Sequence, residues 1–207
     1  MITIVDYNAG NLRSVKRACD AVGIESVVSS DPDVVVRAER VIFPGVGAAP
    51  SAMATLRTSG LDEALRQAFA KGTPILGICL GTQIVLDTSE EGDQGCLGLV
   101  KGKTVRFALS DPRLKIPHIG WNSVEIVRPH PLLSEIRNGD DFYFVHSYYP
   151  APSDPADVCA ATEYGVRFCS ALARKNLFAT QFHPEKSGRI GLRILERFAK
   201  WDGSLPA

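Results

Sequence analysis

Residues 74–85 read PILGICLGTQIV, an apolar run in which Cys79 stands between Gly77 and Gly81. The first half of this run is typical of a buried strand, and residues 80–88 predict a helix. A cysteine at a sharp strand-to-helix turn is typical of a nucleophile elbow, because flanking glycines permit a strained backbone and the close approach of neighbouring chain. In an open α/β sheet such a turn lies at the carboxyl edge of the strands, where ligands bind.

The sulfur of Cys79 would then lie beside the amino terminus of a helix. The partial positive charge there favours the thiolate over the thiol, and the backbone N–H of Leu80 would point toward an oxyanion formed next to the sulfur. The alternative is that Cys79 is a small buried apolar residue. The turn alone does not separate the two interpretations, because a nucleophile also needs a base.

Strands and helices alternate upstream of this turn. Short apolar strands are expected at 2–6, 26–30 and 40–45, and helical spacing of apolar residues predicts helices that end at Gly23 and Gly72. Because alternating strands and helices build parallel sheets covered on both faces, this half predicts an α/β fold.

The second half is rich in strands. Successive strands are expected at 104–109, 121–127, 141–149, 157–164, 167–175 and 177–183. Hairpin turns are expected at Gly165 and at Lys175-Asn176, and the proline-rich segment 149–155 is expected to be a loop. A final helix carries Ile190, Ile194, Leu195, Phe198 and Trp201 on one face. We therefore predict one α/β domain over residues 1–207, an open, mostly parallel, twisted sheet flanked by helices with an antiparallel section in the second half.

Composition argues against several classes of protein. The 207 residues include 23 basic and 23 acidic ones and no basic run, so we expect no binding to nucleic acid or to an anionic membrane. The start, MITIVDYN, lacks the features of a signal peptide, and no apolar stretch approaches the roughly 18 residues of a membrane span. The five scattered cysteines contain no CxxC pair, which indicates a reducing, cytoplasmic setting.

The segment QFHPEKSG (181–188) offers a base for Cys79. His183 and Glu185 are two positions apart, and in extended chain such side chains point the same way. Pro184 between them restricts the preceding residue to extended conformations. A carboxylate so placed would orient the imidazole and stabilise its charged form. If the strand before this segment lies beside the strand that ends at Cys79, the histidine reaches the sulfur.

Two alternatives remain for these residues. His-Pro-Glu could be an ordinary strand-ending turn, or Cys79, His183 and Glu185 could bind a metal ion. Zinc ligands usually occur as closely spaced pairs, and no second ligand stands near Cys79 in the sequence. We therefore predict neither a metal nor a cofactor.

Several segments together resemble a known family. GICLGTQ (77–83), with HPE far downstream, resembles the class I (triad-type) glutamine amidotransferases, and PGVGA (44–48) and CLGLVKG (96–102) fit the same family in order. The resemblance covers essentially the whole chain and implies a flavodoxin-like fold. Four segments resemble more closely the glutaminase subunits of imidazole glycerol phosphate synthases, namely DYNAGNLRSV (6–15), PHIGWN (117–122), YFVHSYY (143–149) and QFHPEKSG.

The chain departs from that closer pattern at three positions. Asn8 stands where glycine is usual, Thr82 where methionine is usual, and Ala49 where an aromatic residue is common. None of the three is a residue of the triad Cys79, His183 and Glu185, so the resemblance to the family stands.

The resemblance implies a mechanism. The thiolate of Cys79 attacks the side-chain amide of glutamine, His183 gives a proton to the departing ammonia and then activates water, and Glu185 orients His183. It also implies two further groups of residues: backbone N–H groups of Val46, Gly47 and Leu80 around the oxyanion, and Gln83, Ser147 and Tyr148 around the glutamine. The alternative for the VHSYY segment is a core strand with an alternating face.

The resemblance also implies a partner. The chain contains no candidate synthase domain, so the ammonia acceptor should be a second polypeptide, a (β/α)8-barrel cyclase subunit that makes imidazole glycerol phosphate and AICAR in histidine biosynthesis. Trp121, in a short loop expected to be exposed, is the main candidate for contact with this subunit, because tryptophan is enriched at interface hot spots. Weaker candidates for the same heterodimer interface are His118, Asn122, Asn11 and Lys186. The alternatives are a core position for Trp121 and simple helix capping for Asn11.

Three competing functions remain open. The first is an amidotransferase subunit of another pathway, such as anthranilate or aminodeoxychorismate synthesis, against which PHIGWN and DYNAGN argue. The second is a stand-alone cysteine hydrolase of related fold, which commonly has histidine directly after the cysteine, where this chain has Leu80. The third is a non-catalytic scaffold, which would have no use for an intact set of Cys79, His183 and Glu185.

Overall fold

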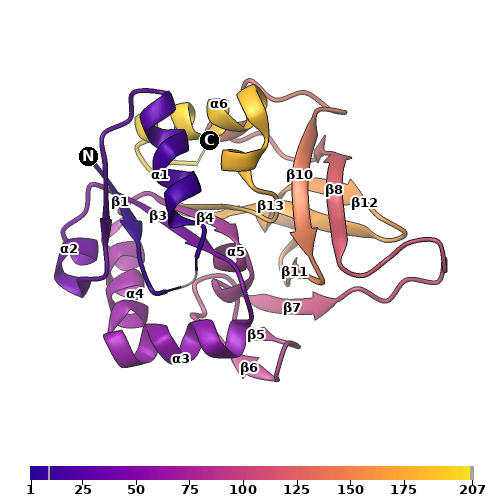
Figure 1. Cartoon of the computed structure of the whole chain (residues 1–207), viewed down its shortest axis with the longest axis horizontal. Coiled ribbons are helices and arrows are strands. Elements are labelled where there is room, and N and C mark those ends of the chain that lie inside the picture. The colour runs from indigo at the N-terminus through magenta and orange to yellow at the C-terminus, as the bar shows by residue number, and fades with distance from the viewer. Residues whose placement is uncertain (9, 206–207) are drawn as a thin grey trace.

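An eight-stranded sheet runs through the molecule in the order β2-β1-β3-β4-β14-β13-β12-β9 (Figure 1). The computed structural model describes residues 1–8 and 10–205, so Ala9 of the DYNAGNLRSV segment and residues 206–207 lie outside the described residues. The strands of this sheet are β1 (Ile2–Val5), β2 (Ser26–Ser29), β3 (Arg40–Gly45), β4 (Ile75–Cys79), β9 (Glu125–Ile126), β12 (Val158–Glu163), β13 (Arg167–Arg174) and β14 (Leu177–Thr180).

The first five strands in that order pair in parallel and the remaining pairs are antiparallel. The predicted fold class is therefore confirmed. The two predicted hairpin turns are also confirmed, with positive φ at Gly165 (67°) and at Lys175 (51°). Because Thr180 of β14 lies opposite Ile78 of β4, the chain that carries His183 leaves the sheet beside Cys79.

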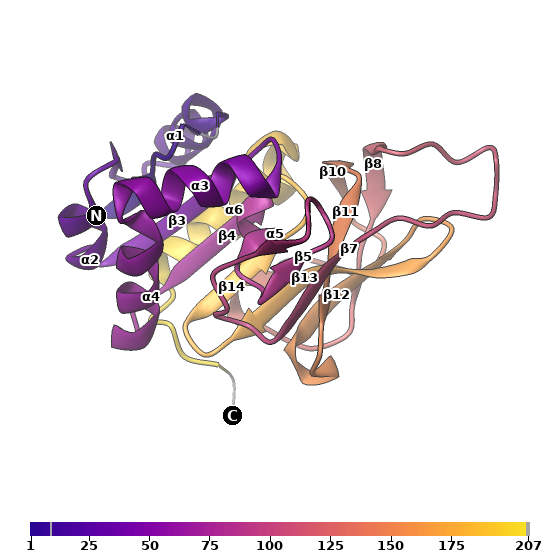
Figure 2. The same ribbon diagram turned by 90° about the horizontal axis from the view of Figure 1, so that it is seen from below.

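Helices cover both faces of the sheet. α1 (Leu12–Ala21) and α6 (Gly188–Lys200) pack on one face, and α3 (Ala49–Ser59) and α4 (Leu61–Lys71) pack on the other, as Figure 2 shows. Alternate residues of β3 divide between the two cores, since Ile42 faces α1 and α6 whereas Val41 and Phe43 face α3 and α4. Strand β3 therefore contributes side chains to both cores. The helices cover the faces of the sheet, and its carboxyl edge remains available for a site.

Two smaller sheets extend from the antiparallel end of the molecule (Figure 1). One pairs β8 (His118–Ser123) with β10 (Asp141–His146), and the other has the order β11-β7-β5-β6. The strands of the latter are β5 (Thr88–Ser89), β6 (Gln94–Gly95), β7 (Gly102–Arg106) and β11 (Tyr148–Pro152). The short helical elements are α2 (Pro32–Val36), α5 (Leu80–Ile84), η1 (Pro131–Leu133), η2 (Pro155–Asp157) and η3 (Pro184–Lys186).

Several predicted boundaries were wrong. The segment 141–149 is two strands, because the chain leaves one small sheet at Ser147 and enters the other. The segment 149–155 is not wholly a loop, since residues up to Pro152 pair with β7 on a sheet edge, where a proline without an N–H is tolerated. Trp121 lies within a strand rather than in a loop.

The predictions for three helices were also wrong or missing. The helix after Cys79 ends at Ile84, because the chain must turn to enter β5 at Thr88. No sequence pattern predicted α2 or α3. The sequence of α3, APSAMATLRTS, is dominated by small and polar residues, so its buried stripe is hard to recognise from the sequence.

Candidate active site

The backbone at Cys79 is strained, as a nucleophile elbow requires. Cys79 has φ 54° and ψ −106°, in the positive-φ region that side chains other than glycine rarely adopt. The flanking glycines serve close packing: a Cβ on Gly81 would lie 2.0 Å from the Phe43 carbonyl oxygen, and one on Gly77 would lie 2.8 Å from Ala179. The strain therefore sits on the cysteine itself, and the glycines allow its neighbours to press against the turn.

Thr82 ties the elbow to the strand that leads to the histidine. Its hydroxyl, fully buried, donates a hydrogen bond of 2.6 Å to the carbonyl of Thr180, at the end of β14. Methionine, usual in the resembled pattern, could not make this bond. Asn8, the second departure from that pattern, has φ 61°, a region that asparagine tolerates better than most residues.

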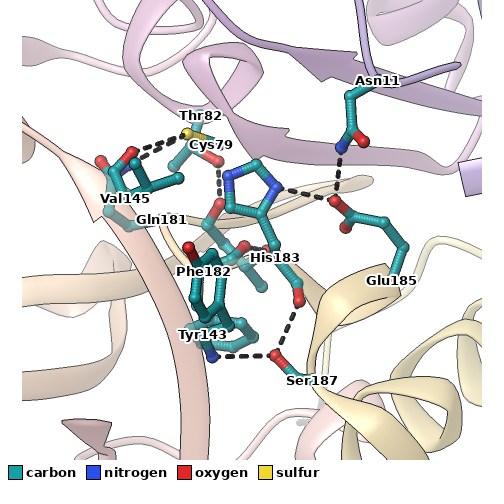
Figure 3. A network of polar contacts seen from close by, with 11 residues as sticks. Asn11, Cys79, Thr82, Tyr143, Val145, Gln181, Phe182, His183, Glu185 and Ser187 are labelled. Atoms are coloured by element: carbon teal, nitrogen blue, oxygen red, sulfur yellow. Dashed lines mark hydrogen bonds and ion pairs between the residues drawn. The ribbon is translucent and has the colours of Figure 1, made fainter. Parts of the chain in front are cut away.

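His183 is held between the cysteine and a carboxylate (Figure 3). Its Nδ1 lies 2.7 Å from Oε1 of Glu185, and its Nε2 side faces Cys79 without a hydrogen bond to any described residue. The predicted contact between His183 and Glu185 is confirmed, and His183 itself is extended as predicted, but the chain after it is not. Pro184 begins the 3-10 turn η3, so the carboxylate folds back onto the imidazole.

The turn that carries Glu185 is anchored to the β10 strand. The Ser187 hydroxyl donates to the carbonyl of His183 at 2.7 Å and accepts from the backbone N–H of Tyr143 at 3.0 Å. The backbone N–H of His183 donates to the carbonyl of Tyr143 at 3.0 Å. These bonds fix the histidine backbone, so the imidazole needs only its carboxylate partner to be oriented.

The electrostatic surroundings make His183 a charged group. Burial alone would lower its pKa, but the interactions of the imidazole with the Cys79 sulfur and with the Glu185 carboxylate raise the pKa to about 10. At neutral pH the imidazole is therefore protonated beside the sulfur. A proton on Nε2 stands ready for a leaving group, and the carboxylate stabilises the positive charge.

Asn11 contacts the carboxylate of this pair. Its Nδ2 donates to Oε1 of Glu185 at 2.5 Å, and its side chain makes no capping bond to α1 (Figure 3). Asn11 therefore occupies the N-cap position of α1, as the capping alternative expects, but its side chain binds Glu185 instead of capping the helix. Glu185 Oε1 receives two donors, whereas its buried Oε2 has no partner among the described residues.

A cavity of about 290 Å³ opens beside Cys79 at the carboxyl edge of the sheet. It collects every residue that the sequence predicted for the oxyanion and the glutamine, since Val46, Gly47, Leu80, Gln83, Ser147 and Tyr148 all line it. Gly47 has φ 102°, and the backbone N–H groups of Val46 and Gly47 make no hydrogen bond to described residues. Leu80 opens α5, so its N–H has no partner within the helix.

Two polar side chains in or beside the cavity were missed by the sequence analysis. Glu91 lines the cavity, and its Oε2 accepts from the N–H of Ala49 at 2.7 Å. Gln181 is fully buried behind the cysteine, with its Nε2 3.7 Å from the sulfur of Cys79. No local pattern separates Glu91 from its neighbour Glu90, which is instead held by Lys103. For Gln181 the signal was its position two residues before the histidine, on the same face of the strand expected over 177–183.

Comparison with known proteins decides the family. A family model described as glutamine amidotransferase class-I matches residues 3–201. The chain belongs to the class I glutamine amidotransferases.

Similar full-length proteins carry a name more specific than that of the family. Proteins named imidazole glycerol phosphate synthase subunit HisH are 48% identical in Dehalococcoides mccartyi, with 97% of each chain covered, and 46% identical in Chromobacterium violaceum, with 99% of each covered. A solved glutamine amidotransferase has the same fold, with TM-score 0.76 at 18% identity, over 98% of this chain and 100% of the other. The structure of PurLQS from Thermotoga maritima gives TM-score 0.73 at 19% identity, over 96% and 97%.

The residues predicted to meet a partner divide between two faces of the amidotransferase. On the outer face of the β8–β10 sheet, Trp121 is 57% exposed and packs edge-on against Tyr143, over which Lys186 places its ammonium group. The core alternative for Trp121 is therefore wrong. His118, in contrast, is 2% exposed on the inner face, where it cannot offer its side chain to a partner. Asn122 is half-buried and bonded to His118.

Within residues 1–8 and 10–205, no group of three or more histidine, cysteine, aspartate and glutamate side chains is arranged to hold a metal ion. In the same part of the chain, no helix combines the length and the apolar character needed to cross a bilayer.

Proposed function

We propose that this chain hydrolyses glutamine to glutamate and ammonia through a thioester on Cys79, as the glutaminase subunit of an imidazole glycerol phosphate synthase in histidine biosynthesis. The observation that carries the proposal is the cavity that has the strained Cys79 at its floor and the charged His183–Glu185 pair beside it. The names of the full-length relatives favour this pathway over anthranilate or aminodeoxychorismate synthesis. We infer that the chain acts as one amidotransferase domain.

The first half of the reaction builds the thioester. The sulfur of Cys79 attacks the amide carbon of glutamine, and the carbonyl oxygen becomes an oxyanion held by the N–H of Leu80 and one from the Val46–Gly47 segment. The C–N bond then breaks, and the nitrogen leaves as ammonia with the proton from Nε2 of His183. The charged resting state of His183 suits it for this donation.

The second half releases glutamate. The now neutral His183 takes a proton from water, and the resulting hydroxide attacks the thioester carbon. The C–S bond breaks, the sulfur departs as thiolate, and His183 is again charged. Glu185 keeps the ring in one orientation through both steps, and Asn11 holds Glu185.

The far end of the cavity suits the amino-acid end of glutamine. Glu91 contributes a carboxylate to the lining, which pairs with the α-ammonium group of the substrate. Gln83 donates both hydrogens of its amide to protein acceptors, the Tyr148 carbonyl at 2.8 Å and the Gln181 side chain at 3.0 Å. Its amide oxygen therefore remains as an acceptor for the same ammonium group, with Ser147 and Tyr148 around the α-carboxylate.

The ammonia acceptor is a separate cyclase subunit of (β/α)8-barrel fold, bound as a heterodimer. Support comes from the word subunit in the names of the relatives and from the exposed apolar side chains of β8, Ile119 (59%) and Trp121 (57%). Exposed aromatic residues of this kind are typical anchors of protein interfaces. We place the complex in the cytoplasm, in keeping with five free cysteines.

The test compares two nitrogen sources. In the complex with its cyclase subunit, Cys79→Ala is expected to abolish glutamine-dependent synthesis, by at least about a thousandfold, because the nucleophile is gone. Synthesis from added ammonium salt should be retained, since that nitrogen bypasses this chain. Glutamine-dependent synthesis that survives in the variant would contradict the proposal, and loss of both activities would show that Cys79 is structural.

A further inference from the structure

Two buried histidines face each other under the cavity. His118 of β8 and His146 of β10 are directly opposite in the antiparallel register, and both are almost fully buried, at 2% and 5% exposed. Their rings are joined by a hydrogen bond of 3.0 Å between His118 Nδ1 and His146 Nε2. His146 lines the cavity, whereas His118 lies behind it between the rings of Phe144 and Tyr164. Neither takes part in the chemistry proposed above.

The partners of this pair fix every proton in it. His146 Nδ1 lies 2.8 Å from the carbonyl of Tyr148, which only accepts, so Nδ1 carries a hydrogen. Burial and nearby positive charge lower the pKa of His146 to about 3, and burial lowers the pKa of His118 to about 4, so both rings are neutral. His146 Nε2 is then an acceptor, and the shared hydrogen belongs to His118 Nδ1.

The hydrogen-bond network of the two histidines continues outward to Asn122. A neutral His118 with a hydrogen on Nδ1 has a bare Nε2, which accepts from the side-chain Nδ2 of Asn122 at 3.3 Å. The second hydrogen of that nitrogen goes to the Glu163 carbonyl at 3.0 Å, which settles the orientation of the amide. The hydrogen bonds therefore run in one direction, from Asn122 through His118 and His146 to the Tyr148 carbonyl.

The same hydrogen-bond network continues inward to Cys79. The Tyr148 carbonyl also accepts from Gln83 Nε2 at 2.8 Å, and the other hydrogen of that amide goes to Gln181 Oε1 at 3.0 Å. The amide of Gln181 points its Nε2 at the sulfur of Cys79, 3.7 Å away. A single carbonyl thus joins the histidine pair to the side chain that faces the substrate.

We propose that His118 and His146 are positioning residues, which fix the Tyr148 carbonyl and through it the orientation of Gln83 toward bound glutamine. The proposal rests on the glutaminase function proposed above. It assigns His118 a role inside the protein rather than at the partner interface. If either ring adopted the tautomer with its hydrogen on Nε2, two donors would face each other and one hydrogen bond of the network would be lost.

The kinetic test uses the complex with the cyclase subunit. His146→Leu removes the donor to the Tyr148 carbonyl and should raise the KM for glutamine about tenfold, with a smaller change in kcat, because the cysteine and its base remain. His146→Asn keeps an N–H near the Nδ1 position and should restore KM to within about threefold. The matched control is His130→Leu, which removes another buried histidine, stacked on Phe178 away from the cavity, and should leave KM unchanged.

Three kinetic outcomes would overturn the proposal. They are an unchanged KM in a folded His146→Leu, an equal rise in His130→Leu, and failure of His146→Asn to recover any of the loss. Thermal unfolding of each variant establishes that it is folded.

A spectroscopic test needs no variant and no activity. Nitrogen-15 NMR of the full chain should show His118 and His146 neutral and protonated at Nδ1 between about pH 6 and 9. Protonation at Nε2, or titration of either ring in that range, would overturn the proposal. A chain that shows these signals but hydrolyses no glutamine with any cyclase subunit would instead contradict the proposed function.

Discussion

Buried histidines lie on two sides of the same cavity, and they differ in charge. His183 is fully buried and its pKa is raised to about 10, whereas His118 and His146 are nearly as buried and their pKa values are lowered to about 4 and 3. The difference lies in the partners. His183 meets the carboxylate of Glu185 and the sulfur of Cys79, while the hydrogen bonds of the other two rings go to a neutral amide, a carbonyl and each other. Burial alone gives a neutral ring, and only adjacent negative charge makes a buried histidine a proton donor at neutral pH.

The largest effect is expected from removing that negative charge. Glu185→Gln keeps the size of the side chain but cannot stabilise the imidazolium, so His183 should behave more like His146. We expect kcat for glutamine hydrolysis to fall by about a thousandfold or more. Steady-state kinetics of the complex would measure it, and a fall of less than about tenfold would contradict the role of Glu185.

The two faces of strand β8 provide the next prediction. Trp121 points outward and His118 inward, so their variants should differ in kind. Trp121→Ala is expected to weaken binding of the cyclase subunit by about thirtyfold, the loss of one interface anchor. The free energy of unfolding of the isolated chain should change by less than about 0.5 kcal/mol, since the side chain is exposed. Titration calorimetry and urea unfolding would separate the two quantities, and unchanged affinity would remove Trp121 from the interface.

The next prediction concerns the hydrogen bond that Asn11 donates to Glu185. Asn11→Ala removes one of the two donors to Glu185 Oε1 and leaves the triad residues in place. We expect kcat to fall about tenfold, as is usual for a hydrogen bond to a charged group. Ser14→Ala, one turn along α1, is the matched control and should retain wild-type kcat. Equal activity of the two variants would show that His183 alone suffices to orient the carboxylate.

The smallest effect concerns stability and pH. Because the folded-state pKa of His183 lies above the unfolded value near 6.5, its contribution to stability is complete below about pH 6.5 and is lost as pH rises through about 10. The unfolding free energy of the wild type should exceed that of His183→Gln by on the order of 1 kcal/mol near pH 6, and the difference should shrink toward pH 10. Urea unfolding at several pH values would measure this, and a difference that grows with pH would contradict the charged state of His183.

The strands of the parallel half could be predicted from the sequence because each of their signals is local. Apolar runs marked β1, β3 and β4, and Gly23 and Gly72 marked the turns after two helices, both with positive φ. The candidate nucleophile and its base were also predictable, since the glycine-flanked Cys79 and the HPE segment are short motifs, and the pairing of β14 with β4 joined them as expected. The roles of these residues remain predictions.

The pair of neutral histidines beside the cavity could not be predicted in the same way. His118 and His146 come together only because β8 and β10 form a separate two-stranded sheet, and no local pattern states which strands pair. A weak signal existed in the alternation of YFVH, which places Phe144 and His146 on one face. Glu91 and the contact of Asn11 with Glu185 could not be predicted either, because both depend on contacts distant in the sequence.

The central claim is that glutamine is hydrolysed through Cys79. The most direct measurement is mass spectrometry of the complex, quenched in acid during turnover of glutamine, with peptide mapping of the modified residue. We expect a glutamyl group on Cys79 and on none of the other four cysteines, and no adduct in Cys79→Ser. Full turnover without an adduct on Cys79, or with an adduct on another cysteine, would contradict the account.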